Sequence, residues 1–341
     1  MKSIEEVNVS GKRVFVRADL DVPRGTEGSY EAATRLNNLK PTVDYLLEKG
    51  AAQVIIAGHI GRPKVADQAL STGQLLDPLE AILVRSIIFK PDLVSAQTAI
   101  DRQELSDRII LLENLRFWPG EIENSADFAK ELAKLADIYV NEAFGNCHRV
   151  HASMVELPGL LPAYAGIHLT LEIKTLSHIL DYPERPFVAI VGGAKIETKV
   201  PAIKNLVSVA DVVLVGGELP AEIAKAGHKF SANVKVAKVS QNEKDITKES
   251  ISEFEKVIET AKTVVWNGPM GVFEEGYRQG SAAVAEAIIA SGAYSVIGGG
   301  ETSEFLAKSG LISKFSFVSA GGGAMLEFLA GKKLPALEAL E

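Results

Sequence analysis

The sequence predicts an α/β fold made of two Rossmann-like domains, each a parallel sheet between two layers of helices, joined by a connecting helix. The chain has 341 residues, more than the roughly 250–300 at which a single hydrophobic core stops growing. In both halves, short apolar runs alternate with amphipathic segments, as parallel strands alternate with helical crossovers. Glycines or basic residues follow these runs, at the sheet edge where α/β proteins bind their ligands.

Basic residues follow the predicted strands of the first half, residues 1–164. These strands lie within RVFVRADLDVP (13–23), QVIIAGHIGRP (53–63), IILLENLRF (109–117) and IYVNEAFGNCHR (138–149). The basic residues are Arg35, His59, Arg62, Arg116, His148 and Arg149. Each arginine taken alone is typical of a solvated surface charge, but the carboxyl ends of parallel strands meet at one edge. Because a guanidinium can hold a carboxylate or a phosphate through two hydrogen bonds, the set favours a small dianion as ligand.

The second half continues the same alternation after a connector. Residues 165–182 have the apolar spacing of a helix and are expected to form that connector. In the second domain, residues 183–326, strands are expected within FVAIVGG (187–193), DVVLVGG (211–217), NVKVAKV (233–239), KTVVWNGP (262–269), YSVIGGG (294–300) and FSFVSAGGG (315–323). Helices are expected to begin at Val200, Ser250, Ser281, Thr302 and Met325.

Glycines replace the basic residues at the strand ends of this second half. They are Gly192, Gly193, Gly216, Gly217, Gly268, Gly298 to Gly300 and Gly321 to Gly323. A tight turn explains each of them separately, but their accumulation at one edge predicts phosphates bound at helix N-termini. VGGAKIETKV (191–200) adds Lys195 and Lys199, although the chain has no Walker A motif. In GGGET (298–302), Thr302 and Glu301 suit either an ordinary helix start or a nucleotide phosphate with Glu301 on Mg²⁺.

Composition narrows the class of partner and the compartment. The net charge of −8 disfavours a general nucleic-acid binder, which needs basic surface to displace counterions. Cys147 is the single cysteine, so no internal disulfide can form, as is typical of a reducing compartment. MKSIEEVNVSGKRVF has acidic residues where a signal peptide would be apolar. Leu157–Leu171 is too short and too interrupted by proline to span a bilayer. We therefore expect a cytoplasmic protein without a membrane or nucleic-acid partner.

The motifs together resemble the phosphoglycerate kinase family. RVFVRADLDVP, GHIGRP, LLENLRF, NEAFGNCHRVHAS, VGGAKIETK, VVWNGPMGVFE, GGGET and SAGGGAMLEFLAGKKLP match that family's blocks in the family's order over nearly the whole chain. The resemblance implies a monomeric hinge enzyme of glycolysis and gluconeogenesis. It would transfer a phosphoryl group reversibly between ATP and the carboxylate of 3-phosphoglycerate, giving ADP and 1,3-bisphosphoglycerate, with Mg²⁺.

The resemblance also implies roles for particular residues. Those expected around phosphoglycerate are Asp19, Asp21, Arg35, His59, Arg62, Arg116 and Arg149, with Asp21 standing where the family usually has asparagine. Those expected around the nucleotide are Gly192, Gly193, Lys195, Lys199, Gly216, Gly217, Asn267, Glu274, Gly298, Gly299, Gly300, Glu301 and Thr302, with Glu301 on the metal. Arg35, Lys199, Gly322 and Gly323 are expected to act on the moving phosphoryl group. The tail, about 327–341, is expected to pack back on the first domain.

The chain is shorter than the family in two regions, the segment after GHIGRP and the stretch between VGG and WNGP. Only residues 218–265 separate VGG from WNGP, about half the family's usual stretch, and Glu218 replaces a third glycine. This region helps to form the family's adenine pocket. An active kinase is therefore weighed against a phosphoglycerate-binding or scaffold protein with an impaired nucleotide pocket. Without the resemblance, a dehydrogenase of a phosphorylated acid would be the alternative, but the chain has no G-x-G-x-x-G motif.

Overall fold

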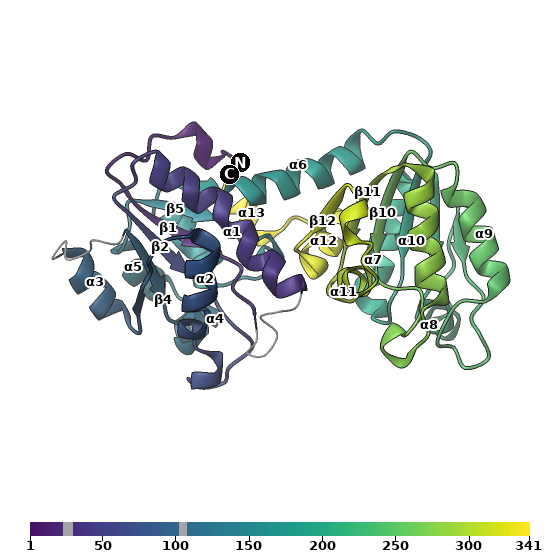
Figure 1. The fold of residues 1–341 in the computed structure, drawn as a ribbon, viewed down its shortest axis with the longest axis horizontal. Coiled ribbons are helices and arrows are strands. Elements are labelled where there is room, and N and C mark those ends of the chain that lie inside the picture. Colours follow the sequence, from purple (N-terminus) through teal and green to yellow (C-terminus); the bar gives the residue numbers. More distant parts are fainter. Residues whose placement is uncertain (23–29, 102–107) are drawn as a thin grey trace. The chain divides into compact units, whose positions relative to one another are not determined.

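The structure, a computed structural model, describes residues 1–22, 30–101 and 108–341 (Figure 1). The chain divides into two compact units. Unit 1 comprises Met1–Ile173 and Lys333–Glu341, and unit 2 comprises Lys174–Lys332. Both chain ends therefore belong to unit 1 (Figure 1).

Unit 1 is built on a six-stranded sheet in the order β3-β4-β2-β1-β5-β6, and every strand pair in it is parallel. The strands are β1 (Arg13–Arg17), β2 (Gln53–Ala57), β3 (Ile88–Lys90), β4 (Ile109–Leu112), β5 (Ile138–Asn141) and β6 (Ala163–Ala165). The α-helices of this unit are α1 (Tyr30–Glu48), α2 (Leu76–Leu83), α3 (Leu93–Asp101), α4 (Pro119–Ile122), α5 (Ala126–Ala133) and α13 (Pro335–Glu338). A π-helix covers Ala152–Glu156.

Helices bury both faces of this sheet. Val14 and Val16 of β1 share one hydrophobic core with Leu39 and Val43 of α1. Phe15 points to the opposite face, where its ring stacks on Tyr139 at 6.1 Å between centroids. Burial on both faces explains why the central strands are continuous apolar runs rather than alternating ones.

Unit 2 repeats the architecture with the order β12-β11-β10-β7-β8-β9, again with parallel pairs throughout. Its strands are β7 (Phe187–Val191), β8 (Val212–Val215), β9 (Val234–Val236), β10 (Thr263–Asn267), β11 (Tyr294–Gly298) and β12 (Phe317–Ser319). Its helices are α7 (Ile196–Val209), α8 (Leu219–Ala226), α9 (Lys248–Ile258), α10 (Gln279–Ser291), α11 (Gly300–Lys308) and α12 (Gly322–Leu329). Helix α6 (Ile167–Asp181) runs from unit 1 into unit 2.

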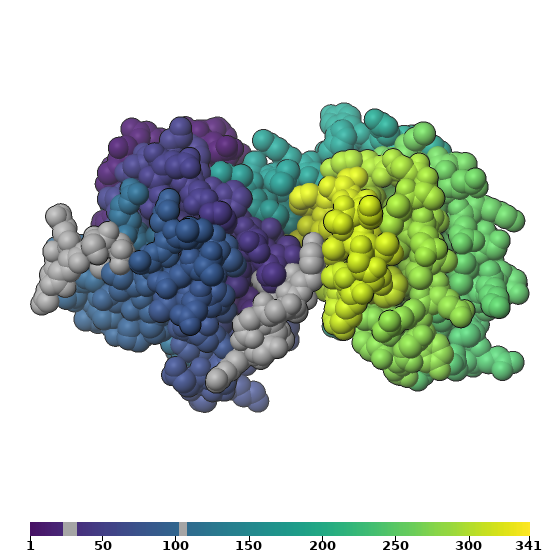
Figure 2. All heavy atoms as spheres, viewed as in Figure 1, coloured from purple at the N-terminus to yellow at the C-terminus, as the bar shows by residue number. Residues whose placement is uncertain are grey.

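The core of unit 2 lies mainly between its sheet and helices α9, α10 and α11. Trp266 of β10 is fully buried there with Phe254 of α9, Ile288 of α10 and Phe305 of α11. In the view of Figure 2, light-green and yellow segments late in the chain form most of the visible face of this unit. The fold prediction, two parallel-sheet α/β domains, is thus confirmed.

The element boundaries differ from the predicted ones in two respects. The helices of unit 2 begin two to four residues earlier than expected: α7 begins at Ile196 rather than Val200, and α12 at Gly322 rather than Met325. Glycine and lysine residues that were expected in loops therefore form the first turns of these helices. Pro201 accordingly lies inside α7 rather than in its first turn. The short strands β3 and β6 were not expected. Each has three residues, mostly partly buried, so the sequence carries too short an apolar run to mark them. No helix in residues 1–22, 30–101 or 108–341 is long and apolar enough to cross a membrane.

Candidate functional site

Unit 1 gathers charged side chains just beyond the carboxyl ends of β1, β2, β4 and β5. Arg35 lies on α1, and its Nη1 donates to both carboxylate oxygens of Asp19, at 2.8 and 2.9 Å. The side chain of Arg35 is 17% exposed and that of Asp19 is 7% exposed. This ion pair holds the Arg35 side chain in place at the edge of the sheet.

A second set of contacts fixes the loop after β2. The backbone N–H of Gly61 donates to Asp21 Oδ1 at 2.7 Å, and Arg116 Nη1 donates to the carbonyl oxygen of Gly61 at 2.5 Å. Gly61 has φ +61°, the left-handed conformation that glycine adopts without strain. The residues after β1 and β4 are thus both tied to one residue of the loop after β2, Gly61. Arg62, the next residue, is exposed.

The electrostatics of this edge are those of an anion site. Burial, together with the charges of Arg17 and Arg149, lowers the pKa of Arg116 to about 10. Burial and neighbouring arginines lower the pKa of His151 to about 3. Burial, followed by Arg17 and Arg116, lowers the pKa of His59 well below its ordinary value. Burial is the largest cause of all three shifts, and the positive charge of the neighbouring arginines adds to it; a bound anion would offset the contribution of the arginines.

Three residues of this edge were not predicted from the sequence. Arg17, Glu121 and Ser153 are completely buried beneath the basic side chains. Arg17 was taken for a strand residue, because it ends the apolar run RVFVR, and nothing nearby in the sequence marks its partners. A charged residue at the end of a strand that is otherwise buried on both faces was the one available signal.

In unit 2 the glycines lie at the carboxyl ends of the strands, and several are required by contacts among the loops themselves. A Cβ added to Gly192 would lie 2.2 Å from the carbonyl oxygen of Pro269. Gly268 has φ +98°, and a Cβ there would lie 2.1 Å from the carbonyl oxygen of Gly192. A Cβ at Gly217 would approach the nitrogen of Gly193 to 2.6 Å, and one at Gly298 would approach Met325 Sδ to 2.0 Å. These glycines let the loops pack closely enough to form one continuous edge.

Helix N-termini supply donors along this edge. Helices α7, α11 and α12 begin here, and none of them has a side-chain hydrogen bond at its N-cap. The start of α12 lies against the start of α11, since a Cβ on Gly322 would be 3.1 Å from the Cα of Gly299. Uncapped N-termini present backbone N–H groups and the positive end of the helix dipole to an anion. This geometry suits a chain of phosphates.

Lys199 is the buried cation of this edge. Its Nζ donates to Asn267 Oδ1 at 2.5 Å and to the carbonyl oxygen of Asn267 at 3.3 Å. Burial lowers its pKa to about 8, with Glu301 opposing the effect and Lys195 reinforcing it. Among the described residues, no carboxylate oxygen lies within 4.0 Å of Nζ. The ammonium is therefore held by neutral acceptors, and a phosphate bound there would supply the missing charge.

The other predicted nucleotide residues divide into buried and exposed ones. Thr302 is fully buried, and its Oγ1 accepts the N–H of Gly268 at 2.9 Å. Glu301 is exposed in the first turn of α11, and a Cβ on Gly193 would lie 3.8 Å from its Oε2. Lys195 and Glu274 are exposed. Thr302 thus joins two of the loops, whereas these three can meet a ligand.

The donor set at Glu301 fits Mg²⁺ brought by a nucleotide. No group of three or more histidine, cysteine, aspartate or glutamate side chains able to hold a metal occurs in the described part of the chain. Mg²⁺ usually binds through one or two carboxylates together with substrate phosphates and waters, rather than in a protein cage. A single exposed carboxylate beside uncapped helix N-termini is such an arrangement.

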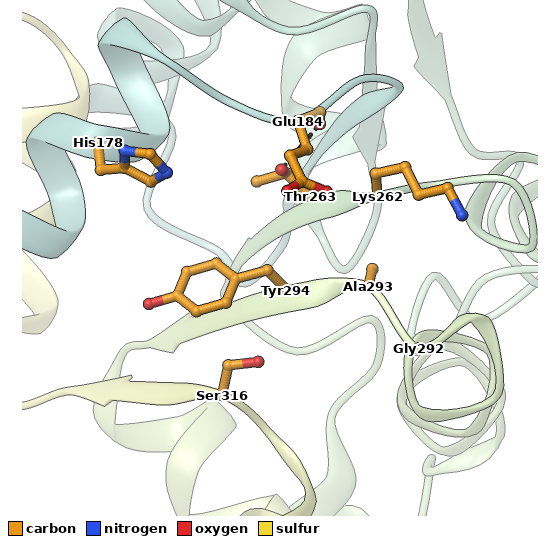
Figure 3. A pocket seen from close by; sticks show the side chains of 8 residues that line it. All are labelled: His178, Glu184, Lys262, Thr263, Gly292, Ala293, Tyr294 and Ser316. Atoms are coloured by element: carbon orange, nitrogen blue, oxygen red, sulfur yellow. Dashed lines mark hydrogen bonds between the residues drawn. The ribbon is translucent and has the colours of Figure 1, made fainter.

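A cavity of about 680 Å³ lies elsewhere in unit 2 (Figure 3). It is lined by His178 of α6, by the beginnings of β10 and β11, and by Ser316 before β12. These are the amino ends of the strands, opposite to the glycine-lined edge. The cavity is therefore separate from the site described above.

Comparison with known proteins gives one consistent result. The phosphoglycerate kinase family model matches residues 4–234 and 219–332. A phosphoglycerate kinase of Desulforudis audaxviator (strain MP104C) is 36% identical over 389 aligned residues, which cover 100% of this chain and 99% of the relative. One of Leptospira biflexa serovar Patoc (strain Patoc 1 / Ames) is 37% identical over 387 residues, covering 99% and 97%. Both alignments exceed 341 residues, so these relatives carry residues that this chain lacks.

Solved structures agree with the sequence relatives. Phosphoglycerate kinase from Coxiella burnetii superimposes with a TM-score of 0.81 at 31% identity, covering 99% of this chain and 98% of that one. The enzyme from Pyrococcus horikoshii OT3 superimposes with a TM-score of 0.85 at 28% identity, covering 100% and 98%.

Proposed function

The chain belongs to the phosphoglycerate kinase family and is a phosphotransferase with a carboxyl group as acceptor, and we propose how its two sites divide that reaction. The basic edge of unit 1 binds 3-phosphoglycerate, and the glycine-lined edge of unit 2 binds the nucleotide. One observation carries the proposal: Arg35 and Lys199, the cations suited to a moving phosphoryl group, are each held at such an edge by a short hydrogen bond.

In unit 1 the phosphoglycerate is held by Asp19, Asp21, Arg35, His59, Arg62, Arg116 and Arg149. Arg35 and Arg116 meet the anionic groups of the substrate, because their guanidinium groups are already oriented by Asp19 and by Gly61. Asp21 acts mainly through Gly61, whose N–H it accepts, which accounts for an aspartate in an anion site. Arg62 is free to reach the substrate from the exposed side.

In unit 2 the phosphates of ATP lie along the starts of α7, α11 and α12. Lys195 and Lys199 meet the phosphate oxygens, Gly216 and Gly217 lie beside the base, and Glu274 meets the ribose. Asn267 holds Lys199 until a phosphate replaces its Oδ1 as the acceptor. Glu301 would hold the Mg²⁺, which when bound neutralises charge on the phosphate oxygens.

The chemistry requires positive charge rather than a general base. The acceptor is a carboxylate, with an ordinary pKa near 4, and is already ionised at pH 7. Phosphoryl transfer is catalysed mainly by positioning and charge stabilisation. Arg35 and Lys199 supply the charge, and the amides of Gly322 and Gly323 join them when the phosphoryl group moves.

Transfer requires the two substrates to meet, and water must be excluded or ATP would be hydrolysed instead. We therefore propose two domains, residues 1–164 with the tail of about 327–341 and residues 183–326, that close through a hinge at the connector, residues 165–182. We further propose that the enzyme is a cytoplasmic monomer.

A coupled assay with 3-phosphoglycerate, Mg²⁺ and ATP tests this function, with each component withheld in turn and with GTP in place of ATP. Turnover that needs all three components supports the proposal and shows whether the shortened region after Gly217 still selects adenine. No turnover with any nucleotide, in a folded protein that still binds phosphoglycerate, would instead favour the phosphoglycerate-binding protein with an impaired nucleotide pocket.

A further inference from the structure

A chain of buried hydrogen bonds lies beneath the basic edge of unit 1. Glu121, on α4, accepts the N–H of Ser153 at 3.0 Å and the hydroxyl of Ser153 at 2.6 Å. Arg17 Nε donates to that same hydroxyl oxygen at 2.8 Å, and Nη1 donates to the carbonyl oxygen of Ala18 at 2.6 Å. Arg17 Nη2 lies 2.9 Å from His59 Nδ1 and 3.9 Å from Glu121 Oε1.

The direction of every bond in this chain is determined by chemistry. A guanidinium has five N–H donors and no acceptor, so His59 Nδ1 must accept. The Ser153 hydroxyl has one proton, which its short bond to the Glu121 carboxylate takes, so its oxygen accepts from Arg17. The proton of a neutral His59 ring is therefore on Nε2, the nitrogen that Arg17 does not contact.

We propose that Glu121 and Ser153, acting through Arg17, are positioning residues that hold His59 as a neutral imidazole with its proton on Nε2, ready to donate one hydrogen bond to the bound anion. The identity of that anion, 3-phosphoglycerate, rests on the proposed function. The protonation state of the His59 ring does not depend on the proposed function.

The surroundings of His59 favour the neutral ring. The ring is 2% exposed, and the charged or titratable groups that act on it are Arg17, Arg116, His151 and Arg35, all of which oppose a positive charge there. A proton on Nδ1 would direct an N–H at the guanidinium of Arg17. The His151 ring lies 6.2 Å away between centroids, and burial together with Arg17 and Arg116 lowers its pKa to about 3.

A neutral donor differs from an imidazolium in its effect on binding. An imidazolium would add a charge that is lost as the pH passes the pKa of the ring, so affinity for the anion would change with pH. With the proton fixed on Nε2, His59 contributes the same hydrogen bond across the physiological range, and the arginines supply the charge.

Nitrogen-15 NMR of the histidine rings tests the proposal on the free protein. The chain has six histidines, and comparison with the spectrum of His59→Gln assigns the His59 ring. We expect a bare Nδ1 and a protonated Nε2 from pH 5.5 to 8.5, without titration. A ring that carries its proton on Nδ1, or that titrates within this range, would overturn the proposal.

The same spectrum, recorded on Ser153→Ala, distinguishes a positioning role of Ser153 from a purely structural one. Ser153→Ala removes the hydroxyl that links Arg17 to Glu121 and leaves no new bulk. We expect the His59 ring in this variant to populate the other tautomer, while burial and the neighbouring arginines keep it neutral. An unchanged ring in a folded Ser153→Ala protein would show that Ser153 supports only the fold.

A pair of substitutions tests the functional side. The amide nitrogen of glutamine reaches the position of Nε2, whereas that of asparagine reaches the position of Nδ1. His59→Gln should keep KM for 3-phosphoglycerate within about threefold of the wild type, and His59→Asn should raise it about tenfold or more, the usual effect of losing a hydrogen bond to a charged group. Equal KM values in the two variants would refute the assigned donor. Because the ring spectra need no substrate, an inactive protein with the expected spectra would refute the proposed function alone.

Discussion

Raising the pH should weaken nucleotide binding, because it removes the charge of Lys199. Burial lowers the pKa of this ammonium from about 10.5 to about 8, which corresponds to about 3 kcal/mol at 1.36 kcal/mol per pKa unit. A lysine whose pKa is lower in the folded chain than in the unfolded chain destabilises the folded state while it is charged. The cost is full below pH 8 and disappears as the pH rises toward 10.5. Nucleotide phosphates reverse the effect, because negative charge raises the pKa again.

The size of the effect follows from the charged fraction. Above pH 8, the fraction of protein in which Lys199 is charged falls about tenfold per pH unit. The Kd for ADP with Mg²⁺ should therefore rise about tenfold per pH unit. The terminal phosphate is already ionised there, because its second pKa is near 6. Titration calorimetry between pH 7 and 9.5, in two buffers of different ionisation enthalpy, measures the Kd and the proton taken up. We expect an uptake that approaches one proton near pH 9.

Two variants make the assignment specific. Lys199→Met should bind ADP weakly at every pH, and without ligand it should be more stable than the wild type at pH 7, by up to about 3 kcal/mol. Lys195→Met is the matched control, because Lys195 is exposed; its affinity should fall while the slope above pH 8 stays. A wild-type Kd that stays constant from pH 7 to 9.5 would refute the reasoning.

Four further outcomes are expected. Arg35→Ala should lower kcat by about 10²–10³, as losses of comparable electrostatic groups do, and leave the Kd for ADP unchanged in calorimetry; near-normal turnover would contradict the role of Arg35. Glu301→Gln should raise the Mg²⁺ concentration needed for half-maximal turnover, and an unchanged requirement would remove Glu301 from the metal site. Gly268→Ala, which places a Cβ 2.1 Å from the carbonyl oxygen of Gly192 at φ +98°, should lower the free energy of unfolding by about 2 kcal/mol or more in denaturant titrations; wild-type stability would mean that the loops can separate. X-ray scattering should show a smaller radius of gyration with both substrates than with either one, whereas identical profiles would argue against hinge closure.

The sequence predicted those parts of the fold and of the candidate site that depend on local patterns. Strands β1, β7 and β10 are runs of five residues buried almost throughout, and such runs are visible without a structure. Strands β3 and β6 have three residues each and become strands through pairing with β4 and β5. The glycines at the strand ends were visible as well. The sequence does not show that many of them are required by contacts between loops, because those contacts exist only in the folded structure.

The support beneath His59 could not be predicted because it joins distant parts of the chain. Arg17 and Ser153 are 136 positions apart, and Arg17 and His59 are 42 positions apart. Each residue has an ordinary local explanation: a strand end for Arg17, a helix turn for Ser153. Only the fold brings the carboxylate of Glu121, the hydroxyl and the guanidinium into one line.

The two edges differ in what stabilises a buried positive charge, and the difference follows from the type of residue that carries it. Arg17 is completely buried with a carboxylate 3.9 Å away, and a guanidinium stays charged at every physiological pH, so its hydrogen bonds always have the same direction. Lys199 is also buried, but it is held by an amide and a carbonyl oxygen of Asn267, and an ammonium can lose its proton when it is buried. A permanent charge with an internal partner suits a part that orients another side chain. A charge whose partner arrives with the substrate suits a residue that binds and stabilises phosphate. The cost of burying the Lys199 ammonium in the empty protein is offset when the nucleotide phosphate binds.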